Sequence, residues 1–179
     1  SMLDVLAHMA EKGFSPSSLG TFLKNPMDFY LERILKIAPQ DFFENQLSPK
    51  DRGTLVHETL EDLYTPYVGA VMEVSYYDSM QKKVTDVLTE KFAAISSVNH
   101  KLTGPNALLI SSYARSIALF LKEEKRRVED GNTIEIIALE KPFSFSMEIP
   151  NYSKSIAIIG TIDQVDKYNG QVRVLDYKT

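Results

Sequence analysis

The 179-residue sequence contains no cysteine. Disulfides, zinc ribbons, thiolate nucleophiles and cysteine-ligated iron–sulfur clusters are therefore excluded together, and a bound metal ion would need oxygen or histidine ligands. Glycine and proline are scarce, at 8 residues each, whereas 44% of the residues are hydrophobic and 25% are charged. This composition excludes a disordered or low-complexity chain. The length is typical of one domain, so we expect a single folded unit over residues 1–179.

Long hydrophobic runs are also missing. No segment approaches the roughly 20 apolar residues that cross a bilayer, and the N-terminus has no basic region followed by an apolar stretch. We therefore expect a soluble, cytoplasmic protein with no membrane partner. The chain opens with Ser1-Met2, which resembles the remnant of a cleaved tag, and Thr179 directly follows a strand-like segment. These two ends indicate a fragment of a longer protein.

An excess of positive charge is the third absence. With 20 lysine and arginine residues against 24 aspartate and glutamate residues, the formal net charge is −4. Simple electrostatic binders of nucleic acid place many cationic side chains on phosphate groups, so this balance disfavours that class. It leaves open an enzyme that meets phosphate groups through bound cations.

Residues 1–131 have helical patterns and residues 132–179 have strand patterns. Three helix starts are marked by a capping residue directly before a proline: Ser15-Pro16, Asn25-Pro26 and Ser48-Pro49. Two longer helices are predicted at about 75–97 and 105–130 from the spacing of their apolar residues.

The predicted helix that begins at Ser48 and runs to about Pro66 has one apolar stripe. Its residues recur at helical spacing: Val56, Leu60, Leu63 and Tyr67. His57 lies beside this stripe, where a lone histidine is more often a packed core residue than a metal ligand. The pair His57-Glu58 begins the H-E-x-x-H pattern of zinc proteases, but position 61 is Glu61, so that class is excluded.

Four strand-like segments are predicted, at 133–139, 143–149, 155–167 and 171–178. The last two are joined by Asn169-Gly170, which is the strongest short signal for a two-residue hairpin turn. The resulting register places Asp163 opposite Asp176, with Cβ atoms about 4.5–5.5 Å apart. On the other face of the ladder, the same register places Asp166 opposite Arg173.

The predicted acid pair is unusual for a sheet, because two carboxylates directly opposite each other repel. A divalent cation between Asp163 and Asp176 would turn this repulsion into a binding site, and oxygen ligands of this kind suit Mg²⁺ or Mn²⁺. Lys178 returns to the same face by the strand's period of two. Two acids and an amine around one point suit phosphodiester hydrolysis. The alternative is a solvated sheet edge at which Lys178 is a simple ion-pair partner.

Three groups of residues follow one another along the chain. They are the opening segments Ser15–Leu19, Phe22, Asn25-Pro26 and Phe29–Leu31, then Arg52–His57, then Gly160–Asp163 with Val174–Thr179. In this order they resemble the RecB-like branch of the PD-(D/E)xK nuclease superfamily, whose helical segment has the form Gly-x-x-x-His. Three motifs in one order are far more specific than Asp-x-Lys alone.

The resemblance implies a role for each matching position. Asp163 and Asp176 would be metal-ligating carboxylates, and Lys178 would be the catalytic lysine. The main-chain carbonyl of Tyr177 and the imidazole of His57 would be further ligands. The implied cofactor is Mg²⁺ or Mn²⁺.

Two glutamates are candidate accessory residues. Glu61 lies one helical turn after His57 and would support the site from outside the ligand shell, although a solvated helix face is the more common role. Glu140 follows the strand-like run at 134–139, and carboxylates on the first strand point toward the metal in some members of the superfamily.

The sequence departs from the family pattern at two places. Many relatives hold an iron–sulfur cluster through a cysteine before the proline of the opening helices and three more near the C-terminus. Here Asn25 precedes Pro26 and no cysteine is present, so no cluster is expected. The family also continues past its lysine with a strand and a helix that carries Gln-x-x-x-Tyr, whereas this sequence ends at Thr179. We therefore expect an incomplete sheet with an exposed edge, and metal binding that is better retained than DNA cleavage.

The predicted fold is α/β, with a helical N-terminal section packed against a mixed β-sheet. Its core would be restriction-endonuclease-like and incomplete at the C-terminus. The predicted function is Mg²⁺- or Mn²⁺-dependent hydrolysis of DNA phosphodiesters, exonuclease-type, in DNA repair or recombination. The expected partners are DNA and, in the full-length protein, a helicase domain or subunit, since the resemblance includes AddB-type helicase-nucleases.

Two other functions remain open at this point. One is a degenerate nuclease fold that only binds DNA or braces a partner subunit. A purely structural domain has no reason to keep a repelling acid pair, which speaks against this function. The other is an unrelated α+β interaction module whose hairpin mimics the motif.

Overall fold

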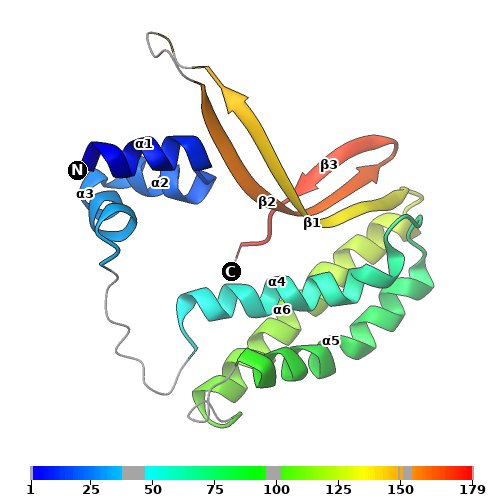
Figure 1. The fold of residues 1–179 in the computed structure, drawn as a ribbon. Helices are drawn as coiled ribbons and strands as arrows, with labels where there is room; N and C mark the ends of the chain where they lie inside the picture. Colours follow the sequence, from blue (N-terminus) through cyan, green and yellow to red (C-terminus); the bar gives the residue numbers. More distant parts are fainter. Residues whose placement is uncertain (1, 38–46, 96–101, 149, 151–154, 179) are drawn as a thin grey trace. The chain divides into compact units, whose positions relative to one another are not determined.

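A computed structural model of the chain describes residues 2–37, 47–95, 102–148, 150 and 155–178 (Figure 1). Within these ranges the chain has six α-helices, two short helical turns and three strands. In order they are α1 (Met2–Lys12), α2 (Pro16–Lys24), α3 (Pro26–Phe29), the π-helical turn η1 (Tyr30–Ile34), α4 (Pro49–Tyr64), the 3₁₀ turn η2 (Thr65–Tyr67), α5 (Val74–Ile95), α6 (Pro105–Glu129), β1 (Ile134–Met147), β2 (Ile156–Tyr168) and β3 (Gln171–Leu175).

Contacts along the chain define two compact units. Unit 1 comprises residues 1–40 and 142–161, and unit 2 comprises residues 41–141 and 162–179. The expectation of a single domain over residues 1–179 stays a prediction, and each unit is described by itself. In the described ranges, no helix combines the length and the hydropathy needed to cross a membrane.

The three predicted proline-marked helix starts are confirmed. In each, the side chain of the capping residue accepts a hydrogen bond from a main-chain N–H of the first turn. Ser15 Oγ accepts from Ser18 N at 3.2 Å and Ser48 Oγ from Asp51 N at 3.1 Å. Asn25 Oδ1 accepts from the N–H of Met27 at 3.0 Å. These bonds satisfy donors that the helix leaves without an internal partner.

Helix α1 was not expected from the sequence, because no capping signal precedes it. It belongs to unit 1, where the turn after it pairs with β2. Phe14 N donates to Ala157 O at 2.8 Å, and Ile159 N donates to Phe14 O at 3.0 Å. Unit 1 also encloses an apolar cavity of about 340 Å³, lined by Leu6, Phe14, Leu19, Phe22, Phe29, Met147, Ile156 and Ile158.

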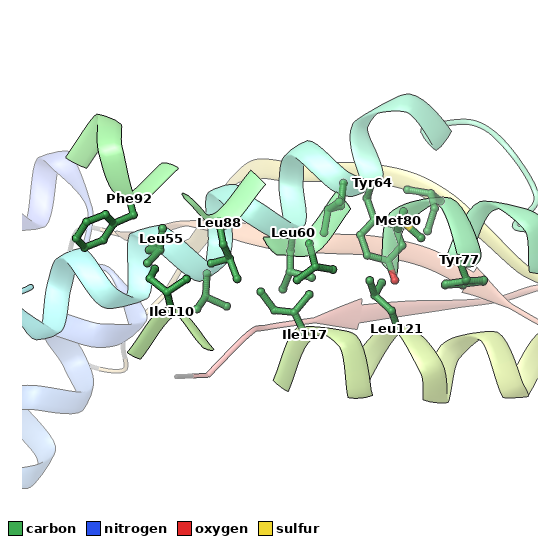
Figure 2. Packing of buried hydrophobic residues seen from close by; sticks show 14 of the residues in the cluster. Leu55, Leu60, Tyr64, Tyr77, Met80, Leu88, Phe92, Ile110, Ile117 and Leu121 are labelled. Atoms are coloured by element: carbon green, nitrogen blue, oxygen red, sulfur yellow. The ribbon is translucent and has the colours of Figure 1, made fainter. Parts of the chain in front are cut away.

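The core of unit 2 is formed by α4, α5 and α6 together with the first half of β1 (Figure 2). Figure 2 labels residues of the three helices that gather in this core: Leu55, Leu60, Tyr64, Tyr77, Met80, Leu88, Phe92, Ile110, Ile117 and Leu121. Val56 and Leu63 of the predicted stripe are also buried, and Tyr67 packs against the cluster. Ile134 and Ile136 reach it from alternate positions of β1. Each such aliphatic side chain stabilises the fold by roughly 1.5–3 kcal/mol.

The sheet has the order β1-β2-β3 and is antiparallel, so the expectation of a mixed sheet was wrong in the described residues. Each strand follows its neighbour through a short connection, and a parallel pair would need a crossover of a dozen or more residues. The segments 133–139 and 143–149, predicted as separate strands, form the single strand β1 as far as Met147.

The predicted hairpin register is confirmed over the pairs from Gln164↔Leu175 to Tyr168↔Gln171. Asn169 and Gly170 both have positive φ, at 50° and 82°, as a type I′ turn requires. Strand β3 ends at Leu175, so the expected ladder pair of Asp163 with Asp176 is not formed. The register of a hairpin decides which residues can oppose each other, but it does not decide where the ladder stops.

Replacing Gly170 with alanine is expected to lower the free energy of unfolding by about 1 kcal/mol, because a Cβ disfavours left-handed backbone. Nothing lies within 4 Å of the added Cβ, so backbone strain is the only cost. The matched control is Gly20→Ala in α2, where the space is also open and φ is not positive. That variant should gain up to about 1 kcal/mol from helix propensity. Urea unfolding measures both, and a Gly170→Ala variant as stable as the parent would contradict the turn assignment.

Candidate metal centre

Helix α4 positions His57 at the edge of the unit 2 core. Its neighbours Leu55 and Val56 are buried, whereas the His57 side chain is 29% exposed. Gly53 lies four residues earlier and therefore on the same helix face, where it contributes no side chain. Gly53, His57 and Glu61 line a cleft of about 490 Å³ together with Thr54, Glu58 and Glu140.

Strands β1 and β2 supply the carboxylates. Asp163 on β2 is only 7% exposed. Glu140 lies inside β1 and has a left-handed backbone, with φ of 43°. A left-handed residue within a strand is typical of a β-bulge, which re-aims side chains and is frequent at functional sites. For a residue other than glycine this conformation costs about 1 kcal/mol, so Glu140 is held there by the surrounding structure.

The structure brings His57, Glu140 and Asp163 together. Each residue offers one ligand atom, and these atoms lie within 4.8 Å of one another. Within the group, the Nδ1 atom of His57 and the Oδ1 atom of Asp163 are 3.3 Å apart. The group thus forms a possible metal site, built from one helix and two strands of unit 2.

The main chain of Tyr177 completes the arrangement. Its carbonyl oxygen lies 2.9 Å from His57 Nε2, and its N–H donates to Asp163 Oδ2 at 2.5 Å. Both ring nitrogens of His57 therefore face an oxygen, although a neutral imidazole carries only one N–H.

The donor set fits a divalent cation. Two carboxylates and a carbonyl oxygen are ligands that suit Mg²⁺ and Mn²⁺, and the imidazole adds one nitrogen ligand. His57 Nε2 and the Tyr177 carbonyl oxygen are 2.9 Å apart, which is a hydrogen-bond distance.

Negative charge accumulates in the cleft. Burial raises the pKa of the Glu140 carboxyl, and the charges of Asp163 and Glu61 raise it further, while His57 lowers it. Glu61, expected either to support the site or to be solvated, thus contributes to the field at the metal centre. Burial also raises the pKa of the Tyr177 phenol, with Asp163 as the next cause.

Asp176 and Lys178 lie outside the three-residue group. Lys178 Nζ is 2.6 Å from Asp176 Oδ2, and the two side chains are 83% and 59% exposed. The contact with Asp176 raises the pKa of Lys178, and the charge of Asp163 adds to this effect. Their predicted roles as catalytic lysine and metal ligand stay predictions.

A second group of polar residues had only a partial signal in the sequence. The predicted opposition of Asp166 and Arg173 is confirmed, and the two side chains form a bidentate pair. Gln164 and Glu124 join this pair in the interior, but polar residues in a strand or on a helix are usually solvent-facing. Only the strand alternation, which places Gln164 on the face opposite Asp163, pointed to its location.

A cleft lined by histidine and acidic side chains can hold a metal ion of the kind used in hydrolysis. The comparison with protein families makes the class specific. Residues 13–179 match the model of the PD-(D/E)XK nuclease superfamily, so the chain belongs to this superfamily.

Two curated relatives come from Rickettsia. The chain is 22% identical over 166 residues to an uncharacterized protein of Rickettsia conorii, which covers 92% of the chain and 19% of that protein. It is 22% identical over 183 residues to an uncharacterized protein of Rickettsia felis, with 97% and 19% covered. The chain thus spans about a fifth of the length of the relatives it matches.

The variant Glu140→Gln is expected to stabilise the metal-free chain near neutral pH. A carboxyl with a raised pKa binds its proton more readily in the folded state, so its contribution to stability falls as pH rises above the unfolded value of about 4.3. The amide removes this cost. Thermal melts in chelator should show a higher melting temperature for Glu140→Gln at about pH 7.5 and a smaller difference at about pH 4.5.

Glu129→Gln is the control for this change, because Glu129 is 48% exposed at the end of α6, away from the cleft. Glu129→Gln should not raise the melting temperature at about pH 7.5. A Glu140→Gln variant less stable than the parent at neutral pH would show that the glutamate is stabilised by its surroundings rather than repelled.

Proposed function

We propose that this chain is a Mg²⁺- or Mn²⁺-dependent deoxyribonuclease of the RecB-like branch, of the exonuclease type and acting in DNA repair or recombination. One observation carries the proposal. In a member of the PD-(D/E)XK nuclease superfamily, His57, Glu140 and Asp163 offer ligand atoms within 4.8 Å of one another beside an open cleft. The two carboxylates of the group repel each other, and a cation bound between them would remove this repulsion.

The ion would be held by His57, Glu140, Asp163 and the Tyr177 carbonyl, with Asp176 as a further carboxylate. When bound, it would polarise a phosphate group and lower the pKa of water. The protein's own part is to orient the ligands. Asp163 is fixed from two sides, since Oδ1 faces His57 and Oδ2 accepts the N–H of Tyr177.

Lys178 is the proposed catalytic residue. The Lys178 side chain is 83% exposed and follows Tyr177 directly in the chain, which supports a contact with a phosphate that approaches from solvent once the ammonium leaves Asp176. There it would orient the attacking water and offset negative charge that develops on the phosphate. Glu61 and Glu58 border the same cleft, and Glu58 lies 4.0 Å from the ammonium of Lys91.

A second candidate function is a degenerate nuclease fold that binds DNA or braces a subunit without cutting. The ion pair between Asp176 and Lys178 favours it, because both side chains are engaged with each other outside the three-residue group. In either function the chain would belong to a larger protein with a helicase domain or subunit. The relatives, of which the chain spans about a fifth, support that larger context.

Metal binding tests the centre directly. Mn²⁺ is expected to raise the melting temperature of the parent, with about 2.7 kcal/mol of stabilisation at a hundredfold excess over its dissociation constant. Asp163→Asn should abolish this effect. Asp78→Asn is the matched control, since Asp78 is a half-exposed aspartate that pairs with Lys125 elsewhere in unit 2. If Asp163→Asn responds to Mn²⁺ as the parent does, the proposed centre is wrong.

Lys178→Met separates binding from catalysis. It should keep the Mn²⁺ response but lower the rate of DNA cleavage by about 10² or more, because one charged group that acts on the reacting phosphate is removed. An exonuclease would release nucleotides from linear DNA and leave closed circular DNA intact. Mn²⁺ binding without any cleavage of either substrate by the parent would favour the non-catalytic function.

A further inference from the structure

Unit 2 contains a second polar cluster, which we call the Arg173 cluster: Glu124, Gln164, Asp166 and Arg173. Glu124 is 2% exposed, and Gln164 and Asp166 are 0% exposed. Buried polar groups destabilise a protein unless they are hydrogen-bonded, and buried charges need a partner. The partners within this cluster therefore show what it is built to hold.

The hydrogen bonds of the Arg173 cluster each have a defined donor and acceptor. Arg173 donates from Nε and Nη2 to the two oxygens of Asp166 and from Nη2 to Glu124, each at 2.9 Å. Gln164 Nε2 donates to Asp166 Oδ2, also at 2.9 Å. The amide of Gln164 is thereby oriented, and its Oε1 accepts the hydroxyl of Tyr177 at 2.5 Å.

Tyr177 is not held by the sheet. The last ladder pair is Gln164↔Leu175, two residues before it. Its main chain is nevertheless fixed at the metal centre, where the N–H meets Asp163 and the carbonyl meets His57. The side-chain hydroxyl is the third polar contact of this residue, and it leads to the opposite face of β2.

We propose that Gln164 and the Tyr177 hydroxyl are positioning groups: the Arg173 cluster anchors the Tyr177 side chain and thereby fixes its main chain against Asp163 and His57. The part of this inference that concerns ion binding rests on the proposed function. The part that concerns the anchoring of the Tyr177 main chain does not rest on it.

The tyrosine ring allows the hydroxyl to be tested alone. The ring lies edge-on to His57 and to Phe120, with centroids 5.9 and 5.8 Å away. Tyr177→Phe keeps these packing contacts and the main chain while removing one hydrogen bond. Gln164→Met removes the acceptor from the other side with a side chain of similar length.

The experiment measures two quantities on the 179-residue chain. The first is amide hydrogen exchange at position 177 without metal, and the second is the Mn²⁺ dissociation constant by calorimetry. Tyr177→Phe and Gln164→Met should each exchange this amide about tenfold faster. Each should also bind Mn²⁺ about tenfold more weakly, as is usual when a group that orients a ligand is lost. Both variants remove the hydrogen bond between Tyr177 and Gln164, and Gln164→Met also removes the donor to Asp166. The double variant should therefore lose little more affinity than Gln164→Met alone.

Val84→Ala is the control for lost stability. Val84 lies on α5 in the hydrophobic core and is 2% exposed. This variant should lower the melting temperature and leave the Mn²⁺ dissociation constant within about twofold of the parent. A change of affinity equal to that in Tyr177→Phe would show that the effect follows stability, and it would overturn the inference.

The outcomes separate the two proposals. If Asp163→Asn abolishes Mn²⁺ binding but Tyr177→Phe and Gln164→Met bind like the parent with an equally protected amide, the positioning inference is wrong and the proposed function stands. If Mn²⁺ binding does not depend on Asp163, the proposed function fails. Exchange at position 177 then decides the anchoring alone: faster exchange in both variants supports it, and unchanged exchange overturns it.

Discussion

The main chain of Tyr177 is the point on which the site geometry depends. It lies beyond the end of β3, yet its N–H and carbonyl contact Asp163 and His57. Asp163 and Gln164 are consecutive residues of β2, so their side chains leave the strand on opposite faces. Tyr177 contacts both, through its main chain on one face and its hydroxyl on the other. Tyr177 thus connects the buried Arg173 cluster to the cleft beside His57.

Two groups of acidic residues lie on either side of β2, and they are neutralised in different ways. In the Arg173 cluster a single guanidinium bonds Asp166 and Glu124, and Arg127 lies 3.2 Å from the second oxygen of Glu124. The hydrogen bonds to Asp166 and Glu124 raise the pKa of Arg173. In the cleft, burial raises the pKa of Glu140, and the charges of Asp163 and Glu61 raise it further. The neighbours of this second group in the described residues are His57, which lies 3.3 Å from Asp163, and the N–H of Tyr177, so a divalent cation could add to the neutralisation of the two carboxylates.

Local signals predicted local structure well. The capping residues before Pro16, Pro26 and Pro49 began helices, and Asn169-Gly170 set the hairpin register, because these features depend on neighbours in the sequence. The prediction failed where distant segments decide the outcome. The register could not show that β3 stops before Asp176, and strand alternation could not show that Glu140 has a left-handed backbone. The possible metal site therefore includes Glu140, whereas the predicted role of Asp176 as a ligand stays a prediction.

A main-chain carbonyl as a ligand creates a particular physical problem. A substitution of the residue changes its side chain but not its main-chain carbonyl, so neighbouring contacts must fix the position of the carbonyl. The segment Asp176-Tyr177-Lys178 solves this by alternation. Tyr177 points inward to Gln164, whereas the flanking Asp176 and Lys178 side chains are 59% and 83% exposed. The buried anchor keeps the carbonyl in place while the two exposed charges remain on the solvent side, where a phosphate group would meet them. In the proposed function, the anchor of the segment and the contact with a substrate would thus belong to different side chains of three consecutive residues.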